Sequence, residues 1–297
     1  MNLKDELILR IPGLKIVENF SYSARTTVGI GGCAELAVSP ANVSQMRKLV
    51  LFLQSNGIPY HIVGCGSNVL ASDCPIKGVT IDTLSCSSVG IDGNIAVCEC
   101  GCKISAILDY LQGKGLGGLS FMEGIPATVG GAIVMNAGAR GDFIGSRVAS
   151  VCAVENGNMK YFTNKECKFA YKSTRFQNNN SAVLSVSLRC DQASPQEIAL
   201  ERKKIRLSRS MLPKGKNLGC IFKNPSGLSA GQLIDECGLK GLKVGGAIVS
   251  EQHANFILNS DRATAEDFCK LIELIKPRVY QSKGILLDEE IRYIGEV

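Results

Sequence analysis

The sequence EGIPATVGGAIVMNAGARG, from Glu123 to Gly141, contains five glycines and one proline in a run of otherwise small and apolar residues. Glycine has no Cβ, so the main chain can adopt positive φ there and bring its amides directly against a flat or anionic ligand. The alternative is a set of tight turns between buried strands, because single glycines commonly mark turns. The run therefore favours a ligand-binding backbone, with structural turns as the competing interpretation.

A second glycine segment, VGCGSNVL at 63–70, follows the extended apolar residues 60–63. Successive N–H groups in such a turn form a nest for phosphate oxygens, to which the Ser67 hydroxyl and the Asn68 amide can add. The segment matches neither the dinucleotide fingerprint GxGxxG nor the phosphate loop GxxxxGK[ST]. Two glycine segments about sixty residues apart instead indicate a long ligand that contains a diphosphate.

The size and composition are those of a globular protein. The chain has 297 residues, 45% hydrophobic and 20% charged, which suffices for two or three substructures and a sizeable core. The net charge of +6 is modest, and the basic stretch ERKKIRLSR at 201–209 lies on a predicted helix. Lys and Arg are scattered elsewhere, and an anionic small substrate explains this stretch equally well, so we expect no nucleic-acid partner.

Thirteen cysteines with irregular spacing occur in apolar strands and helices as often as in loops, which is typical of a reducing compartment. Cys98, Cys100 and Cys102 would share one face of a strand, but they lack CxxC pairs and a fourth ligand. We expect core thiols there and no metal site.

The sequence also predicts a cytoplasmic protein without a membrane partner. Charged residues within the first ten positions interrupt any signal peptide. The longest uncharged run, 49–72, contains glycine, proline and asparagine and cannot form a spanning helix.

Local signals divide the chain into three consecutive parts. Residues 1–78 contain a βαβ unit made of a strand at 35–39, a helix at 44–56 and a strand at 60–63. Residues 79–192 form a second α+β lobe, with a hairpin at Asn156-Gly157. Residues 193–297 form a third part, which begins at the helix-start signal SPQE and contains helices at 229–237 and 264–276.

Six stretches, in this order along the chain, resemble the UDP-N-acetylenolpyruvoylglucosamine reductases: TTVGIGGCAEL at 26–36, VGCGSNVL at 63–70, GIPATVGGAIVMNAGARG at 124–141, FAYKSTRF at 169–176, GCIFKNP at 219–225 and GILLDEEIRYIG at 284–295. The resemblance implies an α+β protein with a vanillyl-alcohol-oxidase (PCMH-type) FAD-binding fold of two α+β lobes. It also implies a third α+β domain that binds the substrate and carries catalytic residues.

The resemblance further implies a monomeric FAD enzyme of peptidoglycan precursor synthesis. NADPH would reduce FAD, and the flavin would then pass a hydride to UDP-N-acetylglucosamine enolpyruvate. No cysteine or histidine stands where covalent flavoproteins of this fold attach the cofactor, so FAD is expected to bind noncovalently. The expected FAD contacts are Gly64, Cys65, Gly66, Ser67, Asn68, Val69, Gly124, Ile125, Pro126, Thr128, Val129, Gly130, Gly131 and Ala132.

Three catalytic residues follow from the matched motifs. Glu290 corresponds to the family's glutamate that polarises the substrate carboxylate, and its neighbour Glu289 would face the other way on a strand. Lys172 stands where the family normally has arginine, which keeps the positive charge but loses the bidentate fork. Cys220 replaces the family's proton-donating serine. The expected substrate-binding residues are Arg175, which is also the alternative cation, Arg209, Lys223 and Asn224.

Two other functions compete with this interpretation. Another FAD enzyme of the same fold would oxidise sugars or lactones, because one fold supports many functions. A non-catalytic UDP-sugar binder is the second alternative, since Lys172 and Cys220 could mark a decayed site. Substrate-dependent NADPH turnover distinguishes both from a reductase.

Overall fold

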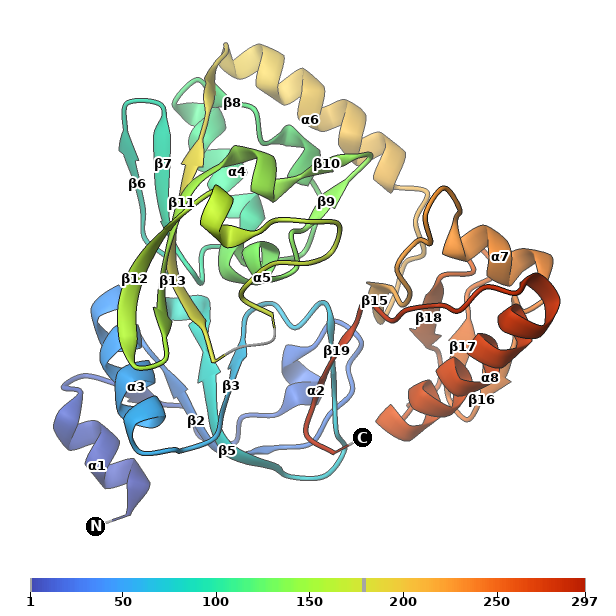
Figure 1. Ribbon diagram of the computed structural model, residues 1–297, viewed down its shortest axis with the longest axis horizontal. Coiled ribbons are helices and arrows are strands. Elements are labelled where there is room, and N and C mark those ends of the chain that lie inside the picture. Colours follow the sequence, from blue (N-terminus) through green and yellow to red (C-terminus); the bar gives the residue numbers. More distant parts are fainter. Residues whose placement is uncertain (1, 178–179, 297) are drawn as a thin grey trace. The chain divides into compact units, whose positions relative to one another are not determined.

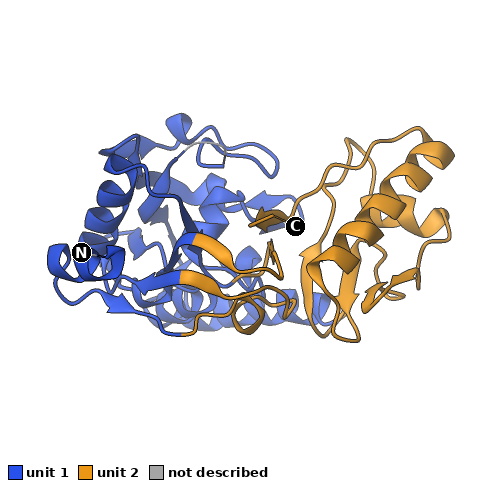
Figure 2. Ribbon diagram, turned by 90° about the horizontal axis from the view of Figure 1, so that it is seen from below, with its two compact units in different colours: residues 1–18, 36–65, 78–210 blue, residues 19–35, 66–77, 211–297 orange. Residues whose placement is uncertain are grey.

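The computed structural model describes residues 2–177 and 180–296 and divides the chain into two compact units (Figures 1 and 2). Unit 1 comprises Met1–Glu18, Leu36–Cys65 and Gly78–Ser210, and unit 2 comprises Asn19–Glu35, Gly66–Lys77 and Met211–Val297. This division differs from the three consecutive parts expected from the sequence, because residues 19–35 and 66–77 pack with the C-terminal part.

The first sheet has the strand order β1-β2-β5-β3, with β1 at Lys15–Ile16, β2 at Ala34–Ser39, β5 at Ile76–Asp82 and β3 at Tyr60–Val63. Helix α3 (Val43–Ser55) begins at Asn42, whose side chain accepts a hydrogen bond from the Gln45 amide. The elements of the predicted βαβ unit are confirmed. The sequence did not predict the position of β5. This strand lies between β2 and β3 and pairs in parallel with β3.

The second sheet is antiparallel, in the order β12-β11-β13-β7-β6. Its strands are β12 (Asn158–Thr163), β11 (Val148–Glu155), β13 (Ala182–Arg189), β7 (Ile95–Glu99) and β6 (Val89–Asp92). The predicted hairpin is confirmed, with positive φ at both Asn156 (50°) and Gly157 (72°) as a type I′ turn requires. Helix α3 contacts β11 and β13 of this sheet, so one hydrophobic core spans the two predicted lobes.

Unit 1 also contains two further helices of ten or more residues and several shorter helices and strands. They are α1 (Leu3–Arg10), α4 (Ile104–Gly113), β8 (Leu116–Gly117), α5 (Val129–Val134), β9 (Gly138–Ala139), β10 (Asp142–Phe143), β14 (Asp191–Gln192) and α6 (Pro195–Arg209). Helix α6 begins as SPQE predicts, with a complete capping box between Ser194 and Glu197.

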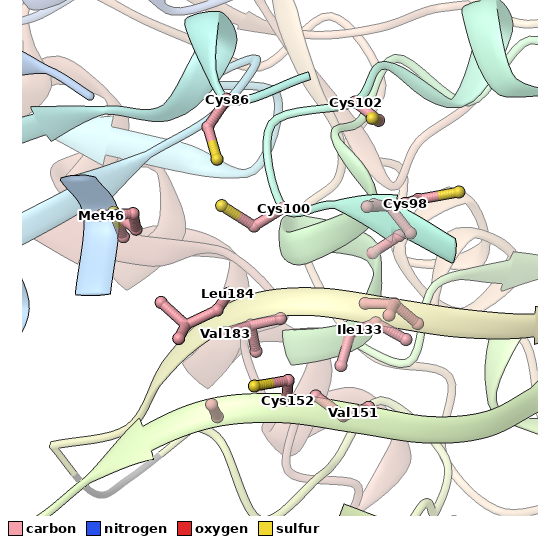
Figure 3. Packing of buried hydrophobic residues seen from close by; sticks show 14 of the residues in the cluster. Met46, Cys86, Cys98, Cys100, Cys102, Ile133, Val151, Cys152, Val183 and Leu184 are labelled. Atoms are coloured by element: carbon pink, nitrogen blue, oxygen red, sulfur yellow. The ribbon is translucent and has the colours of Figure 1, made fainter. Parts of the chain in front are cut away.

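Cysteines fill the centre of this core (Figure 3). Strand β7 ends at Glu99, so Cys98 lies on the strand whereas Cys100 and Cys102 lie just beyond it, and all three are buried. Burial raises the pKa of Cys102 to about 12, which keeps it a thiol. In the part of the chain that the structure describes, no group of His, Cys, Asp or Glu could hold a metal, and no cysteine forms a disulfide.

Unit 2 contains a sheet in the order β15-β18-β17-β16 and a separate parallel pair. The sheet strands are β15 (Asn217–Cys220), β18 (Phe256–Asn259), β17 (Ala247–Val249) and β16 (Lys243–Val244), accompanied by α2 (Tyr22–Arg25), α7 (Ala230–Glu236) and α8 (Ala265–Lys283). The separate pair joins β4 (Val69–Ala71) to β19 (Arg292–Ile294). It therefore connects the end of the glycine segment 63–70 to residues 292–294.

Helix α8 is longer than the sequence predicted. The sequence predicted an end at Lys276, but the helix continues through Pro277 to Lys283 and is capped by Gly284, which has a φ of 69°. Proline lacks the N–H that the helical ladder needs. The apolar face continues past it, however, and the burial of Ile275 and Val279 on either side keeps the helix intact.

Among the described residues, no helix is both long enough and apolar enough to cross a membrane.

Helix α6 is held in unit 1 by a buried carboxylate at the start of the first glycine run. Glu123 accepts from Arg202 Nε at 2.6 Å and from Arg206 Nη2 at 2.8 Å, and Arg202 also donates to Asp109 at 2.7 Å. Burial alone would raise the pKa of Glu123, but the two guanidinium groups outweigh it and hold the pKa below its ordinary value of 4.5.

This network predicts a specific pH dependence of stability. Because the pKa of Glu123 is lower in the folded chain, its stabilisation is present above pH 4.5 and is lost as the pH falls through the folded pKa. Glu123→Gln should lower the free energy of unfolding at pH 7 by about 2 kcal/mol and flatten its decline below pH 4.5. Glu18→Gln, which removes only the exposed pair with Lys4, is the control and should change little. Urea unfolding between pH 3 and 7 would disprove this role if both variants followed the parent curve.

Candidate active site

The two predicted glycine segments meet within unit 1. A Cβ added to Gly64, directly after β3, would lie 2.3 Å from Oγ1 of Thr128. Thr128 is the N-cap of α5, and its hydroxyl accepts from the Gly131 amide at 3.3 Å. A side chain at position 64 would not fit, so the contact between the two segments depends on glycine there.

The glycine segment 123–141 has a buried side that is tied to the core. The Val129 amide donates to the Cys102 carbonyl at 2.8 Å, and the Gly130 amide donates to the Cys100 carbonyl at 2.9 Å. A Cβ at Gly130 would lie 2.9 Å from that Cys100 oxygen. Gly130 is therefore required for packing, and its amide is already used by the fold.

The other side of the same segment is exposed. Gly124, Pro126 and Gly131 are exposed, although they lie among buried residues. Gly124 has a φ of +75°, and the Arg209 side chain of α6 lies beside it, with Nε 3.0 Å from where a Cβ would stand. The exposed backbone and the half-buried Arg209 thus form one surface of unit 1.

The glycine segment 63–70 continues into unit 2 at Gly66, which has a φ of +64°. Its α-carbon packs against the chain at Thr26, and its carbonyl accepts from the Thr27 amide at 3.2 Å. Within the described part of the chain, the amides of Gly66 and Ser67 donate no hydrogen bond. These two donors suit an anionic group such as a diphosphate.

The segment that carries Glu290 is fixed in unit 2 by backbone pairing. The Glu290 amide donates to the Ile221 carbonyl at 2.7 Å, and the Lys223 amide donates to the Asp288 carbonyl at 2.8 Å. The structure therefore places Glu290 in a chain segment next to the one that follows Cys220. The two motifs lie about seventy residues apart in the sequence.

Asn68 joins the glycine segment 63–70 to the segment that carries Glu290. Its Nδ2 donates to the Glu290 carbonyl at 3.0 Å, and its own carbonyl accepts from the Arg292 amide at 2.9 Å. The sequence predicted Asn68 only as a cofactor contact. This second role was missed because no local pattern pairs residues 222 positions apart.

Cys220 ends strand β15 at an irregular point of the sheet. The register with β18 shifts between Asn217 and Cys220, and the intervening Gly219 has a φ of +77°. Such bulges redirect a side chain at the edge of a strand. Cys220 and Lys223 are half-buried, whereas Asn224 is exposed and its Oδ1 accepts from the Ala230 amide at the start of α7.

Lys172 lies in unit 1 on a strained turn. It is the third residue of a turn closed by two hydrogen bonds between Ala170 and Ser173, and its φ is +51°. A left-handed conformation costs a lysine about 1–2 kcal/mol, and such strain is found preferentially at functional sites. The Gln177 side chain donates to the Lys172 carbonyl at 3.0 Å and helps hold this turn.

Arg175 is engaged inside unit 1. Its Nη2 donates to both oxygens of Glu155 at 3.0 and 3.2 Å, and its guanidinium lies 4.2 Å from the centre of the Phe162 ring. Burial would raise the pKa of Glu155, but Arg175 outweighs it and keeps the pKa below its ordinary value. Arg175 therefore secures the loop that carries Lys172.

Two known protein domains match this chain. Residues 34–156 match the model of an FAD binding domain, which makes the chain a flavoprotein with the predicted α+β, PCMH-type fold. Residues 211–294 match the C-terminal domain of UDP-N-acetylenolpyruvoylglucosamine reductase.

Similar proteins span the whole chain. The reductase of Moorella thermoacetica is 37% identical over 289 residues, 95% of this chain and 94% of its own. That of Geobacter metallireducens is 36% identical over 300 residues, 99% of this chain and 100% of its own. The crystal structure of the reductase from Thermus caldophilus superimposes with a TM-score of 0.80 at 30% identity, covering 95% and 100%. The chain therefore belongs to the UDP-N-acetylenolpyruvoylglucosamine reductase family.

The contact between the glycine segments yields a prediction about the cofactor. In Gly64→Ala, the new methyl group would overlap the Thr128 hydroxyl and displace the turn, so FAD should bind at least about 10-fold more weakly. Flavin absorbance after purification and FAD titration would measure this change. Gly113→Ala is the control, because a Cβ there meets nothing within 4 Å. Equal affinity of Gly64→Ala and the parent would refute the role of this contact.

Proposed function

We propose that the chain reduces UDP-N-acetylglucosamine enolpyruvate to UDP-N-acetylmuramate, a step of peptidoglycan precursor synthesis, with NADPH as the electron donor. The observation that carries this proposal is the similarity to the reductase of Geobacter metallireducens over 99% of this chain and 100% of its own. Matches to both the FAD domain and the C-terminal domain support it further.

The residues of the glycine segments fit FAD. The unused amides of Gly66 and Ser67 suit its diphosphate, and the exposed backbone at Gly124 and Gly131 suits the close approach of a flat ring. We infer that Gly64–Val69 and the segment 124–132 hold FAD noncovalently. When bound, FAD supplies the chemistry of accepting a hydride from NADPH and passing it to the substrate.

Three side chains are proposed to assist the reduction. Negative charge develops on the carbon beside the substrate carboxylate, so the reaction needs a polarising group, a cation and a proton donor. We assign these roles to Glu290, Lys172 and Cys220. The strained backbone at Lys172 and the bulge before Cys220 support this assignment, because each fixes the direction of its side chain.

Other polar residues are proposed to bind the nucleotide sugar. Arg209, beside the exposed glycine backbone, and Lys223 supply positive charge for the diphosphate, and Asn224 supplies a polar contact for the sugar. Arg175 is the remaining candidate. Because its guanidinium is paired with Glu155, we propose that it acts mainly by holding the Lys172 turn.

We infer a cytoplasmic location and a monomeric state. Thirteen cysteines without a disulfide in the described chain are typical of a reducing compartment. Size-exclusion chromatography with light scattering would test the monomer.

Steady-state kinetics test the proposed activity against its rival. A reductase should oxidise NADPH only when the enolpyruvyl nucleotide sugar is present. An oxidase of the same fold would instead consume oxygen with sugars or lactones and ignore NADPH. A protein that binds FAD and shows neither activity would be a non-catalytic binder and would contradict the proposal.

The Lys172 assignment predicts a selective defect. Lys172→Met removes the cation near the developing charge, so reoxidation of reduced flavin by substrate should slow by about 100-fold, while reduction by NADPH stays nearly unchanged. Lys172→Arg should restore or raise the rate, because arginine adds a second hydrogen bond. Rapid mixing measures both steps. A harmless Lys172→Met together with a damaging Arg175→Met would show that Arg175 is the cation.

The Cys220 assignment predicts a different series of variants. A thiol with a pKa of about 8.5 is a stronger acid than a serine hydroxyl and can deliver the proton that completes the reduction. Cys220→Ala should show normal bleaching by NADPH but reoxidation slowed by about 100-fold or more, and Cys220→Ser should keep much of the activity. If Cys220→Ala reoxidises as fast as the parent, the donor is another group or water.

A further inference from the structure

A charged residue interrupts an apolar row beside the catalytic glutamate. The segment 287–293 of unit 2 pairs with Phe222 at Glu289 and enters strand β19 at Arg292, so its side chains are expected to alternate between two faces. Leu287 and Ile291 are buried in the core of the unit, and Glu289 lies in the same row between them, with 22% of its side chain exposed. The same alternation assigns Glu290 to the other face. An apolar residue at position 289 would continue the row, so the carboxylate there needs an explanation.

Both oxygens of Glu289 are engaged by partners from unit 2. Lys276 Nζ of α8 lies 2.7 Å from Oε1, and the Tyr293 hydroxyl donates to Oε2 at 2.5 Å. Burial alone would raise the pKa of Glu289, but Lys276 and Tyr293 outweigh it and hold the pKa below its ordinary value. Glu289 is thus a charged group, anchored from a helix and from its own segment.

We propose that Glu289 is a positioning residue for the reduction: clamped by Lys276 and Tyr293, it fixes the register in which Glu290 faces away from α8. A slip of one residue moves every side chain of an extended segment to the opposite face. Positions 289 and 290 are both glutamate. Lys276 alone could therefore pair with a carboxylate in either register. Tyr293 removes this ambiguity, since it shares a face with Glu289 and not with Glu290.

The clamp acts on the hydrogen bonds that define the site. The bonds from the Glu290 amide to Ile221 and from the Lys223 amide to Asp288 form only in the observed register. Asn68 holds the same segment from the glycine turn. Ion pairs that are costly to bury are retained in some proteins because they specify one arrangement. The inferred consequence for catalysis rests on the proposed reductase function.

The test uses FAD-loaded protein and the variant Lys276→Met. Its matched control is Lys283→Met, which breaks a similar pair on the same helix, with Glu236 at 2.6 Å. Lys276→Arg should preserve the clamp and act as the rescue variant. Glu289→Leu should keep the fold, because leucine continues the apolar row, yet it should lose the clamp.

Hydrogen exchange and rapid mixing give two readouts. In Lys276→Met and Glu289→Leu, the Glu290 and Lys223 amides should exchange about 10-fold faster, and reoxidation by substrate should slow by about 10-fold. Bleaching by NADPH should not change. Lys276→Arg and Lys283→Met should behave like the parent in both experiments.

The outcomes separate this inference from the proposed function. Unchanged exchange at both amides would overturn the clamp, and so would faster exchange without slower reoxidation or slower reoxidation without faster exchange. If the parent reduced flavin is not reoxidised by the nucleotide sugar at all, the proposed function fails. In that case the exchange data alone decide whether Glu289 holds the segment.

Discussion

Thr128 presses its hydroxyl against the α-carbon of Gly64, which leaves no room for a side chain at position 64. The contact brings two glycine segments together, and other features of unit 1 follow from it. Thr128 caps α5, and the next two amides, of Val129 and Gly130, are tied to carbonyls of the cysteine-rich core. The buried side of the segment is thereby rigid, so its exposed side can present backbone to a ligand without reorganising.

Unit 2 holds its candidate catalytic residues by a different principle. Backbone pairing, rather than close approach, places the segment of Glu290 beside that of Cys220, and Asn68 ties the glycine turn to the same segment. The side chains of Glu289 and Tyr293 point toward α8, where Lys276 receives the carboxylate. The candidate cofactor and catalytic residues of unit 2 thus share one chain segment as their support.

Local chemistry predicted much of this fold from the sequence. The hairpin at Asn156-Gly157 and the helix that starts at Ser194 depend on neighbouring residues, and both are confirmed. The position of β5 between β2 and β3, and the continuation of α8 past Pro277, depend on distant packing that no local pattern encodes.

The candidate site also contains features that local sequence predicted and features that it did not. Glycine spacing predicted the two backbone segments, whereas the roles of Lys172, Cys220 and Glu290 came from resemblance and remain predictions. The pairs Arg175–Glu155 and Asn68–Glu290 were not foreseen, because their members are 20 and 222 residues apart.

Anaerobic rapid mixing tests the central claim most directly. FAD-loaded protein is mixed with one equivalent of NADPH and then with UDP-N-acetylglucosamine enolpyruvate, while flavin absorbance is followed and the product is identified by mass spectrometry. We predict that NADPH bleaches the flavin, that the nucleotide sugar restores its absorbance without oxygen, and that UDP-N-acetylmuramate forms in an amount equimolar with the flavin. A flavin that stays reduced until oxygen is admitted would contradict the reductase function.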